Sequence, residues 1–218
     1  MARSPLPDRD AALKQYRRRA AVYDLELALF EPIRRRAIAL LAPQRGETVL
    51  DVGCGTGLSL SALRRAVGPQ GRVIGIEQSP EMLDRARQRV RQQRWKNVQL
   101  VCAPAEAAAV PLRADAALFH FTHDVLRRPE AVAQILAQLK PGARVVAAGL
   151  KWAPAWAWPA NLLVLPAALR SVTSLEGLRR PWSHLEARLG PMTEQRLLGG
   201  AVYIAAGRLP PTAPSSPA

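Results

Sequence analysis

A short apolar run that ends in three glycines at alternate positions is the feature that most constrains the fold of this chain. Residues 47–57 read Glu-Thr-Val-Leu-Asp-Val-Gly-Cys-Gly-Thr-Gly, and the run from Thr48 to Val52 suits a strand buried on both faces. The spacing of apolar residues from Leu58 to Val67 is typical of a helix. Because glycine has no Cβ, the three glycines permit a sharp turn and a close approach of a ligand to the backbone. The stretch therefore predicts a ligand-binding turn between a strand and a helix.

An acidic residue at a fixed distance from this turn indicates the kind of ligand. A second strand, from Arg72 to Ile76, runs into Glu77, which lies 77 − 57 = 20 residues beyond the last glycine. The dinucleotide-binding pattern is G-x-G-x-x-G, whereas this chain has G-x-G-x-G, so Gly57 comes one residue too early for it. In an open parallel sheet Glu77 lies beside the turn, where its two oxygens accept hydrogen bonds from both hydroxyls of a ribose.

At these two motifs the sequence resembles the class I S-adenosylmethionine-dependent methyltransferases, in particular the type 11 enzymes that act on quinones and phospholipids. Residues 49–57, V-L-D-V-G-C-G-T-G, look like the first motif of the family, and residues 75–83, G-I-E-Q-S-P-E-M-L, look like its second. Further strands at 97–102, 115–120, 139–149 and 200–207 extend the likeness over residues 10–208. The resemblance implies an α/β fold, a three-layer Rossmann-like sandwich. Its seven-stranded sheet is mostly parallel with an antiparallel last strand, and helices cover both faces.

The resemblance also implies S-adenosyl-L-methionine as the cofactor and names residues that contact it. The methionine end is assigned to Asp51, Gly53, Cys54, Gly55 and Gly57, and the ribose to Glu77, which Gln78 follows.

The adenine contact departs from the family pattern. Relatives carry Gly-Asp-Ala after the third strand, where this chain has Ala103-Pro104-Ala105-Glu106, and proline offers neither a carboxylate nor an N–H. We expect the adenine to be read by the backbone of Ala105 or by Glu106, with Met82 packed on its face. The alternative for Glu106 is a solvated acid at a helix start.

The fourth strand ends in the most reactive cluster of the sequence, His-Phe-Thr-His-Asp at residues 120–124. A histidine that faces the methyl donor has a near-neutral pKa suited to removing a proton from the acceptor, with Asp124 orienting it. We therefore name His120, His123 and Asp124 as catalytic candidates and His120 as a cofactor contact. In the alternative, one histidine caps the strand and Asp124 caps the next helix. We identify no third outside ligand, so no metal site is predicted. The remaining histidine, His184, is expected on a helix surface.

A net charge of +14 and a pI near 11.3 indicate a polyanionic neighbour, or else a compositional excess of arginine. The arginines cluster at residues 17–19, at residues 34–36 and in the alternating run 85–94. Each cluster is either a solvated helix face or a contact with an anionic membrane surface or nucleic acid.

The chain is expected to form one domain over residues 10–208, with flexible ends at 1–9 and 209–218. Two amphipathic helices are predicted within 10–42, the second opened by Pro32, and Tyr16 and Tyr23 are candidate lid residues. The two cysteines and the absence of a signal-like apolar run favour a cytoplasmic protein, peripheral to the inner face of the membrane if the arginines bind lipid.

Residues 151–190 are expected to insert between the fifth and sixth strands and shape the acceptor site. The segment 151–169 approaches the length of a membrane span, but Pro154, Pro159 and Pro166 would break a continuous helix, so no span is predicted. Its tryptophans, at positions 152, 156 and 158, either wall an acceptor pocket, dip into a membrane interface or pack on the protein's own core. A further helix is expected to begin at Pro181.

The sequence therefore predicts a methyltransferase for a small-molecule or lipid-like acceptor. Two alternatives stay open: a nucleic-acid (RNA) methyltransferase, which the charge favours, and a catalytically silent protein that binds S-adenosylmethionine.

Overall fold

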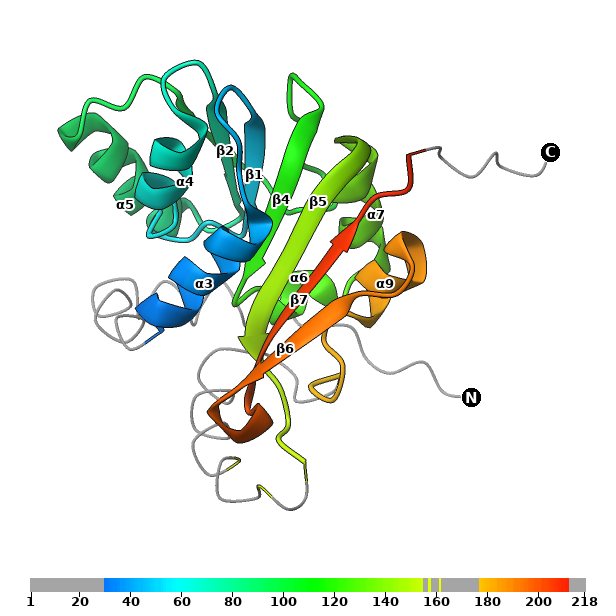
Figure 1. Cartoon of the computed structure of the whole chain (residues 1–218). Coiled ribbons are helices and arrows are strands. Elements are labelled where there is room, and N and C mark those ends of the chain that lie inside the picture. The colour runs from blue at the N-terminus through cyan, green and yellow to red at the C-terminus, as the bar shows by residue number, and fades with distance from the viewer. Residues whose placement is uncertain (1–29, 155–156, 158–160, 162–176, 212–218) are drawn as a thin grey trace.

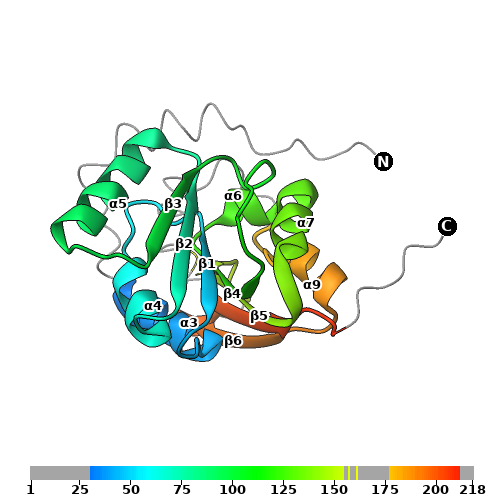
Figure 2. The same ribbon diagram turned by 90° about the horizontal axis from the view of Figure 1, so that it is seen from above.

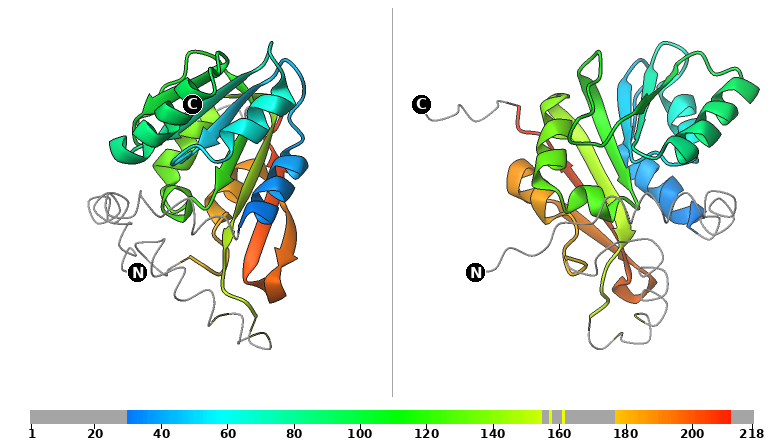
Figure 3. Two further views of the ribbon diagram at one scale, coloured as in Figure 1. Left: turned by 90° about the vertical axis from the view of Figure 1, so that its left-hand side faces the viewer. Right: turned by 180° about the vertical axis from the view of Figure 1, so that it is seen from behind.

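The computed structural model describes residues 30–154, 157, 161 and 177–211 (Figure 1). Several predictions fall outside the described residues. They concern the first leading helix with Tyr16, Tyr23 and Arg17–Arg19, the tryptophans Trp156 and Trp158, and the chain ends at residues 1–9 and 212–218. In the described part, an open sheet forms the centre of the molecule, with helices on both of its faces (Figures 2 and 3).

The sheet has seven strands in the order β3-β2-β1-β4-β5-β7-β6. Strands β1 to β5 pair in parallel, and β7 runs antiparallel to both of its neighbours, β5 and β6. This order confirms the predicted mostly parallel sheet with an antiparallel last strand. The strands are β1 (Thr48–Val52), β2 (Arg72–Glu77), β3 (Val98–Cys102), β4 (Ala114–His120), β5 (Leu139–Leu150), β6 (Thr193–Leu197) and β7 (Val202–Arg208).

Two hydrophobic cores flank the sheet because successive side chains of each strand point to opposite faces. On one face Val49, Val73 and Leu118 pack with residues of α3 (Glu31–Leu41), α4 (Leu60–Val67) and α5 (Pro80–Gln92). On the other face Leu50 and Ile74 share a core with residues of α7 (Pro129–Ala137) and α9 (Ser183–Leu189), beside the short helix α6 (His123–Leu126). Every residue of β1 is buried, as predicted for a central strand covered on both sides. A 3-10 turn, η2 (Leu198–Gly200), joins β6 to β7.

Local sequence signals set most helix boundaries. Ser79 Oγ accepts the backbone N–H of Met82 at 3.3 Å and Pro80 opens the first turn of α5. Pro32 lies in the first turn of α3, as expected. The helix predicted from Pro181 begins at Ser183 instead, because the Ser183 N–H closes a turn with the Arg180 carbonyl at 3.1 Å.

No helix among the described residues is both long and apolar enough to cross a bilayer.

Candidate active site

The glycine turn lies at the carboxyl end of β1, where the sheet order reverses between β2 and β4. Such a switch point leaves a crevice beyond the strand ends. Gly53, Gly55 and Gly57 have φ values of 66°, 56° and 84°, in the left-handed region that favours glycine. A Cβ on Gly53 would come within 2.4 Å of Thr122 Cγ2, so the loop after β4 packs directly on the turn. The turn is therefore held both by its own backbone conformation and by its neighbours.

Glu77 ends β2 and turns its carboxylate back onto the glycine turn. One oxygen accepts the Gly55 N–H at 3.1 Å and the other accepts the Ser79 N–H at 2.8 Å. Burial raises the pKa of this side chain, which is 8% exposed, although the backbone N–H groups act in the opposite direction. A carboxylate accepts about four hydrogen bonds, and the N–H groups of Gly55, Ser79 and Gln78 act on this one, so some acceptor capacity is left for a ligand.

A small cavity beside the turn is lined mostly by charged and polar groups. Its walls are the glycine turn, Asp51, Ser59, His120 from the end of β4 and Arg34 from α3. Asp51 Oδ2 and His120 Nε2 are buried and have no hydrogen-bond partner within the described part of the chain. Buried polar atoms are normally paired, so these two are suited to contact a bound ligand.

The charges of this cavity influence each other. Burial raises the pKa of Asp51 to about 7. The nearby Arg34 guanidinium lowers this pKa, and the Glu77 carboxylate raises it. Burial and then the charge of Arg34 lower the pKa of His120 to about 3. The expectation of a near-neutral pKa is therefore wrong for His120, whose ring is neutral at pH 7.

Arg34 is the residue that the sequence analysis missed. The sequence predicts one role for all three arginines at 34–36, a solvated helix face or a contact with an anionic partner. The structure separates them: Arg34 is only 3% exposed, whereas Arg35 and Arg36 are exposed. Arg34 also pairs with Glu31. The signal lay in the helix spacing: Arg34 precedes the buried residues Ala37, Ile38 and Leu41 by three, four and seven positions, which places it on the buried face.

The histidine cluster is divided between two places. His120 lines the cavity with Asp51, whereas His123 is buried in the first turn of α6 and lines a narrow cavity with Phe121, Leu150 and Tyr203. Thr122 occupies the N-cap position of α6 and Asp124 lies inside the helix. The alternative in which Asp124 caps this helix is therefore wrong.

The predicted adenine-side residues surround the ends of β2 and β3. Met82 is buried in α5 and Ala105 is buried in the loop after β3, where the Ala103 N–H binds the Glu77 carbonyl at 3.1 Å. Gln78 is half-buried, and Glu106 lies 3.6 Å from Arg128 in an ion pair. Glu106 lies in a turn, so its interpretation as an acid at a helix start is wrong.

Cys54, inside the turn, is buried and free, and Cys102 is free and exposed. A Cβ on Gly75 would come within 2.8 Å of Cys54 Sγ, so the thiol packs under the turn against β2. The described residues contain no group of three His, Cys, Asp or Glu side chains placed to hold a metal ion.

The arginines after β2 are mostly solvated. Arg85, Arg91 and Arg94 are exposed, Arg87 pairs with Asp84 at 2.8 Å, and Arg89 donates to the Thr56 carbonyl at 3.3 Å.

The sheet order, the glycine turn and the buried acid after the second strand define a class I, Rossmann-like S-adenosylmethionine-dependent methyltransferase domain. Residues 49–142, the part of the chain that contains the glycine turn and Glu77, match the family described as "Methyltransferase domain".

Known proteins agree with this assignment. The chain is 37% identical over 95 residues to aklanonic acid methyltransferase DauC of Streptomyces sp. (strain C5), an alignment that covers 43% of each chain. Other relatives are named as a protein-L-isoaspartate O-methyltransferase and a 23S rRNA methyltransferase. The chain spans less than half the length of these curated relatives.

Solved structures share the fold. A SAM-dependent methyltransferase from Aquifex aeolicus superposes with a TM-score of 0.55 at 20% identity, covering 81% of this chain and 89% of that one. The [4+2]-cyclase SpnF superposes with a TM-score of 0.68 at 15% identity, covering 94% and 98% of the two chains.

Proposed function

We propose that this protein transfers a methyl group from S-adenosylmethionine to a small-molecule or lipid-like acceptor. The observation that carries the proposal is the pairing of Glu77 with the glycine turn at the sheet's switch point. There a buried carboxylate with free acceptor capacity lies beside backbone that permits close approach.

The amino-acid end of the cofactor is a zwitterion, and the cavity beside the turn offers both complementary charges. We assign the ammonium group to Asp51 and the carboxylate to Arg34, because buried charges need partners and an arginine matches a carboxylate with two parallel hydrogen bonds. Gly53, Cys54, Gly55 and Gly57 would follow the methionine chain. Glu77 would accept the ribose hydroxyls, and Gln78, Met82, Ala105 and Glu106 would surround the adenine.

Methyl transfer is a direct displacement. The acceptor's lone pair forms the new bond to the methyl carbon while the C–S bond breaks, and its electron pair stays on sulfur to give a neutral thioether. Holding the reactants in line supplies effective molarities on the order of 10⁵ M or more, so few catalytic groups are needed.

The proton of the acceptor needs a base. His123 and Asp124 remain our candidates for that role. His120, with a pKa of about 3, is a weak base and fits better as a neutral contact to the donor.

Two relatives favour a small-molecule acceptor, since they are named as methyltransferases of aklanonic acid and nocamycin. An RNA acceptor is the second candidate, favoured by the exposed arginines on and after α5. The resemblance to the cyclase SpnF keeps a third possibility open, a protein that binds the cofactor without methyl transfer. Association with an anionic membrane stays a prediction, tested by sedimentation with anionic vesicles at low and high salt.

One experiment separates these functions. The protein is first titrated with S-adenosylmethionine by calorimetry, then incubated with the methyl-labelled cofactor and a cell extract that is fractionated into lipid, nucleic acid, protein and small molecules. Label in the lipid or small-molecule fraction supports the proposal, and label in RNA supports the second candidate. Binding without label in any fraction would indicate a silent binding protein, and no binding would refute the assignment of the site.

A further inference from the structure

A second, larger cavity lies beyond the carboxyl end of β5. It has a volume of about 570 Å³, within the roughly 300–1,000 Å³ typical of small-molecule sites. Trp152, Ala153 and Pro154 form an apolar wall, and Lys151, Arg179 and Arg196 bring positive charge to the same space. Asn161 also lines it but holds the backbone of Ala153 through both side-chain groups, at 2.8 and 3.3 Å.

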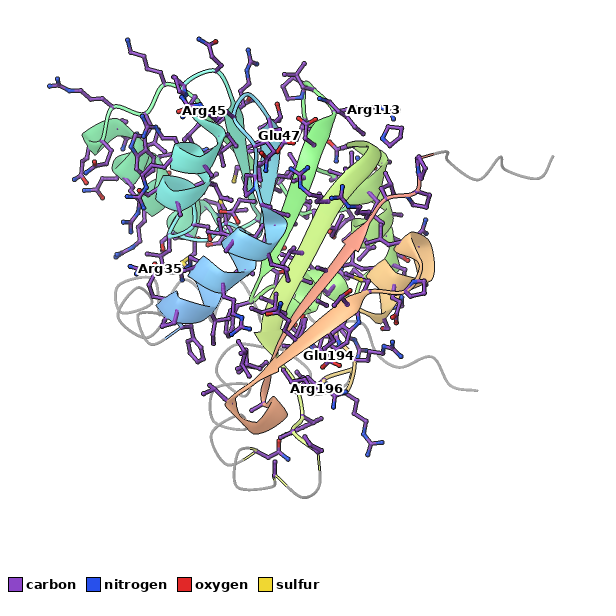
Figure 4. The ribbon with its side chains drawn as sticks, in the orientation of Figure 1. Arg35, Arg45, Glu47, Arg113, Glu194 and Arg196 are labelled. Atoms are coloured by element: carbon purple, nitrogen blue, oxygen red, sulfur yellow. The ribbon has the colours of Figure 1, made fainter. Side chains whose placement is uncertain are left out.

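Among the described residues, positive side chains outnumber negative ones around this cavity. Glu194 accepts hydrogen bonds from Lys151 at 2.7 Å and from Arg196 at 3.1 Å, so one carboxylate is shared by two cations. Partial burial alone would raise the pKa of Glu194, but the hydrogen bonds and charges of Lys151 and Arg196 lower it, so Glu194 is ionised. Figure 4 shows Glu194 and Arg196 close together on β6. Arg179 has no carboxylate partner among the described residues.

Lys151 is the buried member of the three cations, at 8% exposure, whereas Arg179 and Arg196 are exposed. Its ammonium lies 5.3 Å from the centre of the Trp182 ring and shares the Glu194 carboxylate with Arg196. An anionic ligand group placed between Lys151, Arg179 and Arg196 would restore the balance and would form charge-assisted hydrogen bonds.

The cavity lies within reach of the donor. Ala148 pairs with His120 in the sheet, and Lys151 follows three residues later, about 10 Å along an extended chain. The narrow cavity of His123 lies between the donor site and the larger cavity. Leu150 and Leu178 line the narrow cavity, and the residues that follow them in the chain, Lys151 and Arg179, line the larger one.

We infer that the methyl acceptor carries an anionic group, a carboxylate or a phosphate, that binds Lys151, Arg179 and Arg196, with an apolar body against Trp152 and Pro154. This inference rests on the proposed function and names the chemistry of its acceptor. The reactive atom of such a molecule would lie on the side of the cavity that faces His123.

The first test examines the labelled product from the cell extract. The product is passed over an anion-exchange column at neutral pH, before and after phosphatase treatment. Retention that phosphatase abolishes identifies a phosphate monoester, and retention that persists identifies a carboxylate or a phosphodiester. A labelled product that is neutral or cationic overturns the inference and leaves the methyltransferase assignment intact. No label in any fraction overturns both, and the calorimetric titration then shows whether the cofactor site also fails.

The second test uses matched variants with the purified acceptor. Arg179→Gln and Arg196→Gln should each raise the KM for the acceptor at least tenfold, with little change in kcat or in the affinity for S-adenosylmethionine. The control is Arg180→Gln, since Arg180 is adjacent in sequence, pairs with Glu186 at 2.7 Å and does not line the cavity. Equal KM values in all three variants would contradict the inference. Circular dichroism checks that each variant is folded, and Arg196→Lys should recover part of the lost affinity because it keeps the charge.

Discussion

The backbone N–H of Gly55 donates a hydrogen bond of 3.1 Å to the carboxylate of Glu77, and this contact joins the ends of the first two strands of the sheet. The two residues are 22 positions apart in sequence. Because β1 and β2 pair in parallel, their carboxyl ends meet at one edge, and the glycine turn and the acid become the two sides of one site.

Glu77→Ala is expected to weaken S-adenosylmethionine binding by about 2 kcal/mol, roughly 30-fold, because the charge-assisted hydrogen bonds to the ribose are lost. Calorimetric titration measures the change. Asp84→Asn is the control, since Asp84 is an exposed acid on α5 that contacts Arg87 and not the turn. An unchanged affinity in a folded Glu77→Ala protein would refute the ribose assignment.

Arg34→Gln should reduce the affinity for S-adenosylmethionine at least tenfold, whereas Arg35→Gln should leave it unchanged. The two arginines are neighbours on α3, but Arg34 faces the cavity with Asp51 while the Arg35 side chain is 76% exposed. Buried charge pairs are worth more than solvated ones, so only the first substitution should matter. Similar losses in both variants would mean that long-range charge, not a contact, attracts the cofactor.

The pKa of His120 should be about 3 in the folded, cofactor-free protein, which NMR titration of the imidazole ring measures. Arg34→Gln should raise this pKa because a nearby positive charge is removed. A ring that titrates near pH 6.5 in the native protein would contradict the buried environment described for it.

The same shift makes folding stability depend on pH. Since the unfolded chain binds a proton at His120 below pH 6.5 and the folded chain does not, the stabilising contribution is fully present above pH 6.5 and is lost as the pH falls toward 3. Compared with His120→Gln, the native protein should lose about 1.4 kcal/mol of unfolding free energy per pH unit below 6.5. Urea unfolding at pH 7, 6 and 5 tests the slope, and parallel curves for the two proteins would count against it.

Gly57→Ala should destabilise the fold more than Gly46→Ala. Both glycines have positive φ, 84° and 87°, so both substitutions carry the backbone cost of about 1 kcal/mol. A Cβ on Gly57 would in addition meet Leu60 Cδ1 at 2.7 Å and Ala86 Cβ at 3.2 Å, whereas nothing lies within 4 Å at Gly46. Overpacking adds about 1–3 kcal/mol, which equilibrium urea unfolding resolves. Equal losses would show that the turn yields to the added methyl group.

Much of the fold was predictable because it depends on short-range patterns. The run Thr48–Val52 and the glycines after it are local signals with strict steric causes, and the structure has the strand and the turn where they predicted them. The Ser79-Pro80 start of α5 has an equally local cause, a side-chain cap and a preset proline backbone. The position of Glu77 followed from the parallel sheet alone.

The errors share a different cause. Glu106 and Asp124 are acids that sequence context places at helix starts, but Glu106 lies in a turn, and Thr122 takes the N-cap of α6 with Asp124 in its first turn. The pKa of His120 depends on burial and on the charge of Arg34, which is distant in sequence.

The sequence by itself determined the first strand, the glycine turn and the acid that follows the second strand, because backbone sterics and apolar periodicity act over a few residues. Only the tertiary structure decided which charges meet. Arg34 joins Asp51 and His120, and Lys151 joins Arg179 and Arg196, because the folded sheet edge brings together side chains from separate elements. Arg34 and Asp51 are buried there, whereas Arg179 and Arg196 are exposed. Electrostatic energies depend on distance and burial in space, and neither quantity is written along the chain.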